Sequence, residues 1–342
     1  MDLLAASLAR SAELFPQAWD PASDMVRLIR LTEADYRRAS FLDDRILTPQ
    51  TPNRTIPASQ LLAAIGASGM AENCSFIFHI GHVGSTLLSR LLGEHPNVLA
   101  LREPAILRTL AEARLEPKAG GVADDDYLGA FLKLWSRTFR TSQQACVKAT
   151  SFASELAGSI LARPSAPSAI FMFVPAEAYL ATILGAPNSP AEARALAEMR
   201  LMRLHRRLGV ERWHVADLSE GEIIAMSWAC EMCALCSAAE AAPDRVLWLN
   251  FDSFLQSPAK WLAASLRHMG HAAPPEQVAG IVSGREMRRY SKAPEHSYDA
   301  NLRRDLLDQA RQQQAKEISR GLAWLDAAAG EFPLIQSIRL MS

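Results

Sequence analysis

A short apolar run that ends in a glycine-rich loop constrains this chain more than any other feature. Residues 75–80 (SFIFHI) form the run, residues 81–86 (GHVGST) form the loop, and leucines recur along residues 87–92. A short apolar run is typical of a buried strand, and leucines three or four residues apart are typical of a helix. The sequence therefore predicts a strand, a tight loop and a helix over residues 75–94.

Four further apolar runs repeat this alternation with helical segments. They cover residues 98–101, 145–149, 169–174 and 246–251. Such alternation predicts an α/β fold in which a parallel sheet is covered by helices on both faces, a three-layer P-loop-type architecture. Ser151 and Pro175 are expected at the starts of the helices that follow two of these strands.

The remaining segments predict additions to this core. We expect an N-terminal helical extension over residues 1–70, the P-loop α/β domain over 71–296, and a C-terminal helical tail over 297–342. Within the domain, residues 186–242 form a helical insertion. The tail is expected to contain one long helix from about residue 299 to residue 328.

The overall charge excludes some functions. The chain has 36 Lys and Arg against 37 Asp and Glu, a net charge of -1. Nonspecific nucleic-acid binding usually needs a clear basic excess, so no nucleic-acid partner is expected. The apolar stretch over residues 169–186 is interrupted by Pro175 and Glu177, so no stable membrane insertion is expected either.

The cysteines and the first residues indicate a cytoplasmic protein. Five cysteines are too few and too clustered for a disulfide scaffold, which favours a reducing compartment. The first residues contain no basic segment of the kind that begins a secretory signal, so no secretory signal is predicted. The series Cys230, Cys233 and Cys236 has metal-like spacing, but it lacks a fourth cysteine downstream and lies on an alanine-rich helical segment. We interpret these three as buried apolar side chains, and no metal is expected.

The loop itself predicts an anion site. Gly81 and Gly84 let the backbone turn sharply and point N–H groups inward, and the helix start adds partial positive charge. Ser85 and Thr86 can donate hydroxyl hydrogen bonds. Together with Val83 these parts form a cradle for phosphate or sulfate, although a tight turn without a ligand has the same pattern. The residue after Gly84 is serine rather than lysine, which disfavours an ordinary ATP or GTP hydrolase.

Several blocks of residues resemble the sulfotransferase family. The first covers residues 78–88 (FHIGHVGSTLL), followed by 95–98 (HPNV) and 102–104 (REP), and a second covers residues 246–270. The resemblance extends over roughly residues 74–295. It implies 3'-phosphoadenosine 5'-phosphosulfate (PAPS) as sulfuryl donor. It also implies an acceptor hydroxyl or amine on a small molecule, lipid or saccharide, and leaves the oligomeric state open.

The chain departs from that family's pattern at two places. His82 stands where the loop usually has lysine or arginine, and no arginine precedes Pro175, where the family usually holds the donor's 3'-phosphate. Thr182 lies near the family's 3'-phosphate serine, and Lys292 lies where a C-terminal loop closes over the nucleotide. Two basic clusters are candidates to replace the arginine, with a solvated surface as the alternative: Arg194, Arg200, Arg203, Arg206 and Arg207, or Arg288, Arg289 and Lys292.

Three residues are the catalytic candidates. Protonated His82 is expected to neutralise the leaving oxygen, so activity should fall as histidine loses its proton above neutrality. Glu103 is the preferred general base, with a salt bridge to Arg102 or Arg108 as the alternative. Lys148 lies at the carboxyl end of a strand, where open α/β sheets bind ligands, and is expected to stabilise the leaving phosphate.

Two other functions stay open at this point. One is an atypical small-molecule kinase, in which Asp252 would bind magnesium. The other is a noncatalytic nucleotide-binding or partner-binding protein.

Overall fold

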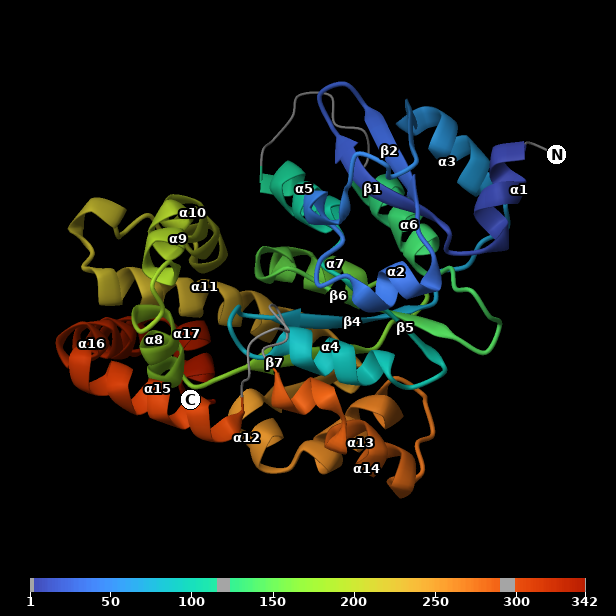
Figure 1. Cartoon of the computed structure of the whole chain (residues 1–342). Helices are drawn as coiled ribbons and strands as arrows, with labels where there is room; N and C mark the ends of the chain where they lie inside the picture. The colour runs from blue at the N-terminus through green and yellow to red at the C-terminus, as the bar shows by residue number, and fades with distance from the viewer. Residues whose placement is uncertain (1–2, 116–123, 290–298, 342) are drawn as a thin grey trace.

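The computed structural model describes residues 3–115, 124–289 and 299–341. A five-stranded parallel sheet in the order β5-β6-β4-β7-β8 lies at its centre (Figure 1). Its strands are β4 (Cys74–His79), β5 (Val98–Arg102), β6 (Gln144–Lys148), β7 (Ala169–Phe173) and β8 (Val246–Asn250). The predicted α/β class is thereby confirmed, and each of the five predicted strands forms within two residues of its expected bounds.

Helices cover both faces of this sheet, because its strands are apolar on both sides. On one face lie α4 (Ser85–Gly93), α12 (Phe251–Gln256), α13 (Pro258–His268) and α14 (Pro275–Ser283) (Figure 1). The other face carries α5 (Ala105–Leu115), α6 (Asp124–Trp135) and α7 (Ala157–Leu161) (Figure 1). The strand that precedes the glycine-rich loop is β4, which is the central strand of the sheet and lies between β6 and β7.

The N-terminal part corrects the prediction of a helical extension. Residues 14–57 contain a three-stranded antiparallel sheet in the order β1-β2-β3. Its strands are β1 (Leu14–Asp20), β2 (Met25–Arg30) and β3 (Asn53–Pro57), and the helices around it are α1 (Leu3–Arg10), α2 (Glu33–Arg38), η1 (Asp44–Ile46) and α3 (Ala58–Gly66). Val26 and Leu28 are buried two residues apart, which is the period of a strand rather than a helix.

The segment over residues 186–242, predicted as a helical insertion, is mostly helical. It contains α9 (Ser189–Ala195), α10 (Ala197–Leu208), η3 (Val215–Asp217) and α11 (Glu220–Ala241). Among the described residues, α11 is long and apolar enough to cross a membrane by length and composition, with a mean hydropathy of 1.3. However, 89% of that stretch is buried inside the fold. It packs against α16 and α7 as a core helix.

Three helix boundaries differ from the predictions. Ser151 does not cap a helix: it begins the 3-10 helix η2 (Ser151–Leu156), with Thr150 before it. Pro175 is the cap of α8 (Ala176–Leu184) rather than its first residue. The single C-terminal helix is divided at Gln314 into α15 (Ala300–Gln313) and α16 (Ala315–Glu331), and it is followed by α17 (Pro333–Arg339). The short 3-10 helices η4 (Pro243–Arg245) and η5 (Arg285–Arg288) complete the described elements.

Candidate functional site

The loop between β4 and α4 has an unusual backbone. Gly81, His82 and Gly84 have φ values of 92°, 55° and 66°. At Gly84 a side chain has no room, because an added Cβ would lie 2.0 Å from Cε2 of Phe251. A tight turn that mixes left-handed residues with others can point successive backbone N–H groups toward one place, as in an anion-binding nest.

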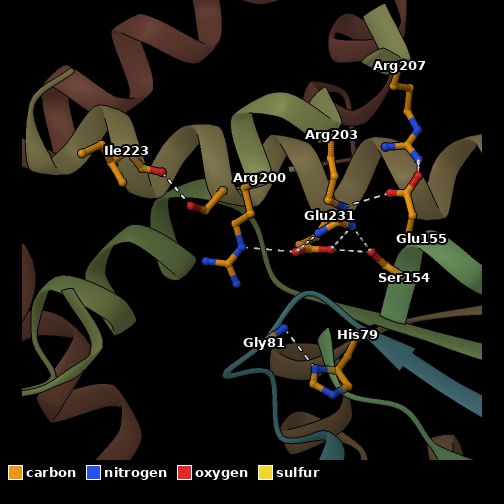
Figure 2. Close-up of polar contacts among 10 residues, drawn as sticks. His79, Gly81, Ser154, Glu155, Arg200, Arg203, Arg207, Ile223 and Glu231 are labelled. Carbon is orange, nitrogen blue, oxygen red and sulfur yellow. Dashed lines mark hydrogen bonds and ion pairs between the residues drawn. The ribbon is translucent and has the colours of Figure 1, made fainter. Parts of the chain in front are cut away.

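His79 holds this loop in place. It is 6% exposed, and its Nδ1 accepts a hydrogen bond from the Gly81 N–H at 3.0 Å (Figure 2). Its Nε2 lies 2.9 Å from the carbonyl oxygen of Ala149. A ring nitrogen that accepts from an N–H is unprotonated, so Nε2 carries the proton and donates to that carbonyl. His79 is therefore a buried histidine that links the loop to the segment after β6.

The loop opens on a cavity of about 240 Å³. Eight of the predicted site residues line it: Gly81, His82, Val83, Gly84, Ser85, Thr86, Glu103 and Thr182. The Thr182 hydroxyl donates to the Ala178 carbonyl oxygen at 2.7 Å within its own helix. Lys292 lies outside the described residues. The structure thus brings together residues that are spread over more than a hundred positions of the chain.

Glu103 and Lys148 form an ion pair at the carboxyl ends of two neighbouring strands. Lys148 Nζ donates to Glu103 Oε1, and the Glu103 N–H donates to the Lys148 carbonyl oxygen at 2.7 Å. The Lys148 side chain is 1% exposed, so it does not face solvent. Glu103 has a φ of 53° and lines the cavity.

The salt bridges expected as the alternative for Glu103 do not form. Arg102 donates to the carbonyl oxygens of Ala39, Tyr36 and Arg37. Arg108 pairs with Glu112, with 2.8 Å between Nε and Oε1. The candidate base is therefore held by the candidate lysine instead.

Arg303, on α15, is a site residue that the sequence analysis missed. Its Nε donates to Asp252 Oδ1 at 3.0 Å, and its guanidinium lies 5.0 Å from the Phe251 ring centre. The side chain is 6% exposed and lines the cavity. No sequence signal links position 303 to a loop more than two hundred residues earlier, because only the packing of α15 brings them together.

Two buried donors at this cavity lack a partner. Within the described part of the chain, neither Thr86 Oγ1 nor Arg303 Nη2 has a hydrogen-bond partner. A buried donor without a partner is costly, and native folds rarely retain one unless water or a ligand satisfies it. A hydroxyl and a guanidinium both suit an oxyanion.

The basic cluster on α9 and α10 is solvated in part, because Arg194 and Arg206 are exposed. Arg200 and Arg203 are 6% and 1% exposed, and both contact Glu231 of α11 (Figure 2). Arg203 and Arg207 also pair with Glu155, at 2.9 Å each. Burial by itself raises the pKa of Glu231, but Arg203 and Arg200 outweigh it and hold that pKa below its usual value of 4.5. Arg200, Arg203 and Arg207 are therefore engaged in ion pairs within the protein.

The three cysteines of α11 are buried, as predicted. Burial raises the pKa of Cys230 to about 12 and that of Cys236 to about 11, so both remain thiols at neutral pH. Asp252, the magnesium ligand of the kinase alternative, is ion-paired with Arg303.

Comparison with known proteins gives structural matches only. No family model matches the chain, and no curated protein matches it. Among solved structures, the sulfotransferase domain from the curacin biosynthetic pathway is 14% identical, with a TM-score of 0.40, and the match covers 75% of this chain and 99% of that one. Sulfotransferase STF9 from Mycobacterium avium is 11% identical, with a TM-score of 0.39, and the match covers 74% of this chain and 81% of that one.

A retinol dehydratase in complex with retinol and PAP is 12% identical, with a TM-score of 0.32, and the match covers 94% of this chain and 95% of that one. The curacin and mycobacterial proteins are sulfotransferases, the family that residues 78–104 and 246–270 resemble.

Proposed function

We propose that this protein is a sulfotransferase-type enzyme that uses PAPS to sulfate a hydroxyl or amine of a small molecule, lipid or saccharide. One observation carries the proposal: Thr86 and Arg303 both line the cavity at the glycine-rich loop, and each has a buried side-chain donor, Oγ1 or Nη2, without a hydrogen-bond partner among the described residues. This combination fits a phosphate or sulfate group better than it fits a neutral ligand.

The residues present suit the 5'-phosphosulfate end of the donor. The N–H groups of Gly84, Ser85 and Thr86 lie at the start of α4, where partial positive charge favours an anion. Arg303, which is paired with Asp252, supplies a positive charge that does not depend on pH near neutrality, whereas His82 of the loop is charged only when protonated. Thr182, on the cavity wall, is the candidate contact for the 3'-phosphate. PAPS bound there would supply the sulfuryl group.

The chain's own residues supply the proton chemistry. Glu103 faces the cavity and takes the proton from the acceptor oxygen or nitrogen. Lys148 holds that carboxylate in place through their ion pair. Protonated His82, also on the cavity wall, lies in the loop and balances the negative charge that forms on the leaving phosphate. Each of these three roles is part of the proposal.

Calorimetric titration with 3'-phosphoadenosine 5'-phosphate (PAP), the donor without its sulfuryl group, tests the proposal. ATP, AMP and inorganic sulfate serve as competitors, and Ser85→Ala removes one hydroxyl of the loop. Ser89→Ala is the matched control, because Ser89 lies one turn further along α4 and its buried hydroxyl has no hydrogen-bond partner among the described residues.

We expect selective binding of PAP that weakens about tenfold or more in Ser85→Ala and stays unchanged in Ser89→Ala. Preference for magnesium-ATP would support the kinase alternative instead. Absence of binding to every nucleotide would overturn the proposal and leave a protein that binds other partners.

A further inference from the structure

A second cavity, of about 470 Å³, lies beyond the edge strand β5. Its walls come from α2, from the C-terminal half of α4, from β5 and from η5 with the residue after it. Arg289 is the only described residue that lines both this cavity and the loop cavity. We name the second cavity the arginine groove.

Positive charge dominates the arginine groove. Six arginines line it against three glutamates among the described residues, which leaves three positive charges. The arginines are Arg37, Arg38, Arg90, Arg102, Arg285 and Arg289. Cavities with such a surplus concentrate anions, because low-dielectric walls focus the field.

Two of these arginines are buried beside each other. Arg90 is 6% exposed and Arg102 is 2% exposed. Arg102 is held by main-chain carbonyl oxygens, at 2.6 Å from Ala39 and 3.0 Å from Arg37, and carbonyls do not neutralise its charge. Burial, together with the charge of Arg90, lowers the pKa of Arg102 to about 9. Within the described residues, no carboxylate forms a salt bridge with the buried guanidinium of Arg102.

The one buried carboxylate of the groove is shared. Glu286, 4% exposed, pairs with Arg289, lies 3.5 Å from Arg285 and lies 3.9 Å from Arg90. A single negative charge thus faces three guanidinium groups. Arg285 on η5 and Arg38 on α2 line the groove with side chains that are 80% and 74% exposed, and Arg38 pairs with Asp35 of its own helix.

We propose that the arginine groove is a second anion site, which binds the phosphate or sulfate group of a ligand. Guanidinium groups recognise these tetrahedral anions through paired, charge-assisted hydrogen bonds. The anion has two sources: free phosphate or sulfate, or an ester group carried by a larger molecule such as a sugar phosphate. The proposal stands independently of PAPS, because it rests on residues outside the loop.

Calorimetric titration with inorganic phosphate at constant ionic strength tests this site. The double variant Arg38→Gln and Arg285→Gln removes two exposed charges, one from α2 and one from η5, and leaves the buried Arg90, Arg102 and Glu286 in place. A second pair, Arg54→Gln and Arg267→Gln, removes two exposed charges elsewhere and is the matched control. Ser85→Ala alters only the loop cavity. Equal thermal midpoints of the unliganded variants confirm that each one folds.

We expect the groove variant to bind phosphate about tenfold more weakly than the control pair, and Ser85→Ala to leave this binding event in place. Phosphate binding that is equal in the groove variant and the control pair would overturn the proposal, and so would an absence of phosphate binding. If only Ser85→Ala has an effect, the loop is the sole anion site and the groove proposal fails while the proposed function stands.

A competition experiment then identifies the source. Glucose 6-phosphate and glucosamine 6-sulfate are titrated against bound phosphate. If either ester displaces phosphate at a concentration about tenfold lower than phosphate itself requires, the groove binds the ester group of a larger ligand. If the esters bind no more tightly than the free ion, the groove binds free anions. Each of these two results supports an anion site. Failure of phosphate and of both esters to bind contradicts it.

Discussion

The ammonium group of Lys148 donates a hydrogen bond to the carboxylate of Glu103, and the two residues lie at the carboxyl ends of the adjacent strands β6 and β5. The lysine is buried, whereas Glu103 reaches the cavity. The pair therefore fixes the direction of a carboxylate whose backbone has a φ of 53°. Strained backbone held by surrounding contacts is common at functional sites.

Replacing Glu103 with glutamine tests its role as general base. Glutamine keeps the size of the side chain but accepts no proton, so we expect sulfuryl transfer to slow by about 100- to 10,000-fold. PAP affinity should stay within a few-fold, because Glu103 is not among the loop's donors. The measurement is steady-state turnover together with calorimetry, and Glu112→Gln on the neighbouring helix is the control. Turnover that stays within a few-fold would exclude Glu103 as the base.

Gly84 is expected to tolerate no side chain. Alanine there combines a left-handed φ of 66° with a Cβ 2.0 Å from the Phe251 ring. We expect Gly84→Ala to lower the free energy of unfolding by about 2–5 kcal/mol and to abolish PAP binding. Gly209→Ala is the control, because Gly209 has a φ of 72° with nothing within 4 Å of an added Cβ.

Gly209→Ala should therefore cost only about 1–2 kcal/mol, measured by urea unfolding, and leave PAP binding intact. Equal losses in the two variants would show that backbone conformation alone, and not contact with Phe251, demands glycine at position 84.

The buried carboxylate of Glu231 should contribute to stability at neutral pH. Glu231→Gln leaves Arg200 and Arg203 without their shared partner, so we expect a loss of about 3–5 kcal/mol in the free energy of unfolding. The Glu231 pKa is lowered in the folded state, so its contribution is present above pH 4.5 and is lost as pH falls through that lowered pKa.

The difference in the free energy of unfolding between wild type and Glu231→Gln should therefore become smaller below about pH 4.5. Denaturant unfolding across that range measures it, with Glu240→Gln at the exposed end of the same helix as control. A difference that is constant with pH would show that the loss comes from packing rather than charge.

The sequence predicted the parts of the fold that depend on local pattern. Apolar runs such as residues 75–80 identified every strand of the central sheet, because parallel strands buried on both faces need apolar residues at successive positions. The N-terminal sheet was missed because β1 contains Pro16 and a register shift between Pro16 and Ala18, which obscures the two-residue alternation. The division at Gln314 has no proline or glycine to mark it.

The site was predictable only where its residues follow the strands. His82 lies in the loop after β4 and Glu103 directly after β5, so the topology of a parallel sheet places both at one edge. Arg303 comes from α15, and its position depends on how that helix packs beside α12. Likewise, the pattern of Arg200 and Arg203 resembled an exposed helix face, because their partner Glu231 belongs to another helix.

Arg303 should be the main cation for the donor. Methionine keeps much of its length but removes the charge, so we expect Arg303→Met to weaken PAP binding by about 10- to 100-fold. Arg304→Met is the matched control, because Arg304 is the next residue on α15 and is exposed. Titration calorimetry measures the PAP affinity of both variants. It also measures the PAP affinity of the double variant Arg303→Met with Asp252→Asn, in which both members of the ion pair are removed.

The double variant separates binding from stability. If Arg303→Met weakens PAP binding only by leaving Asp252 unpaired, the double variant should recover affinity. If the guanidinium contacts the anion, affinity stays low in the double variant. Equal PAP affinity in Arg303→Met and Arg304→Met would contradict the proposed contact.

His82 predicts an unusual pH dependence. Histidine loses its proton near neutrality, whereas the lysine or arginine typical of sulfotransferase loops keeps its proton to much higher pH. We therefore expect the wild-type turnover rate to fall as pH rises past neutrality. His82→Lys should keep its charge and shift that alkaline decline upward by about two pH units or more. The measurement is the turnover rate from pH 5.5 to 9 with PAPS saturating, in wild type and variant.

The loop φ of 55° at this position strains either side chain alike, so the comparison isolates charge. A decline at the same pH in both proteins would assign the titration to another group and remove His82 from the leaving-group role.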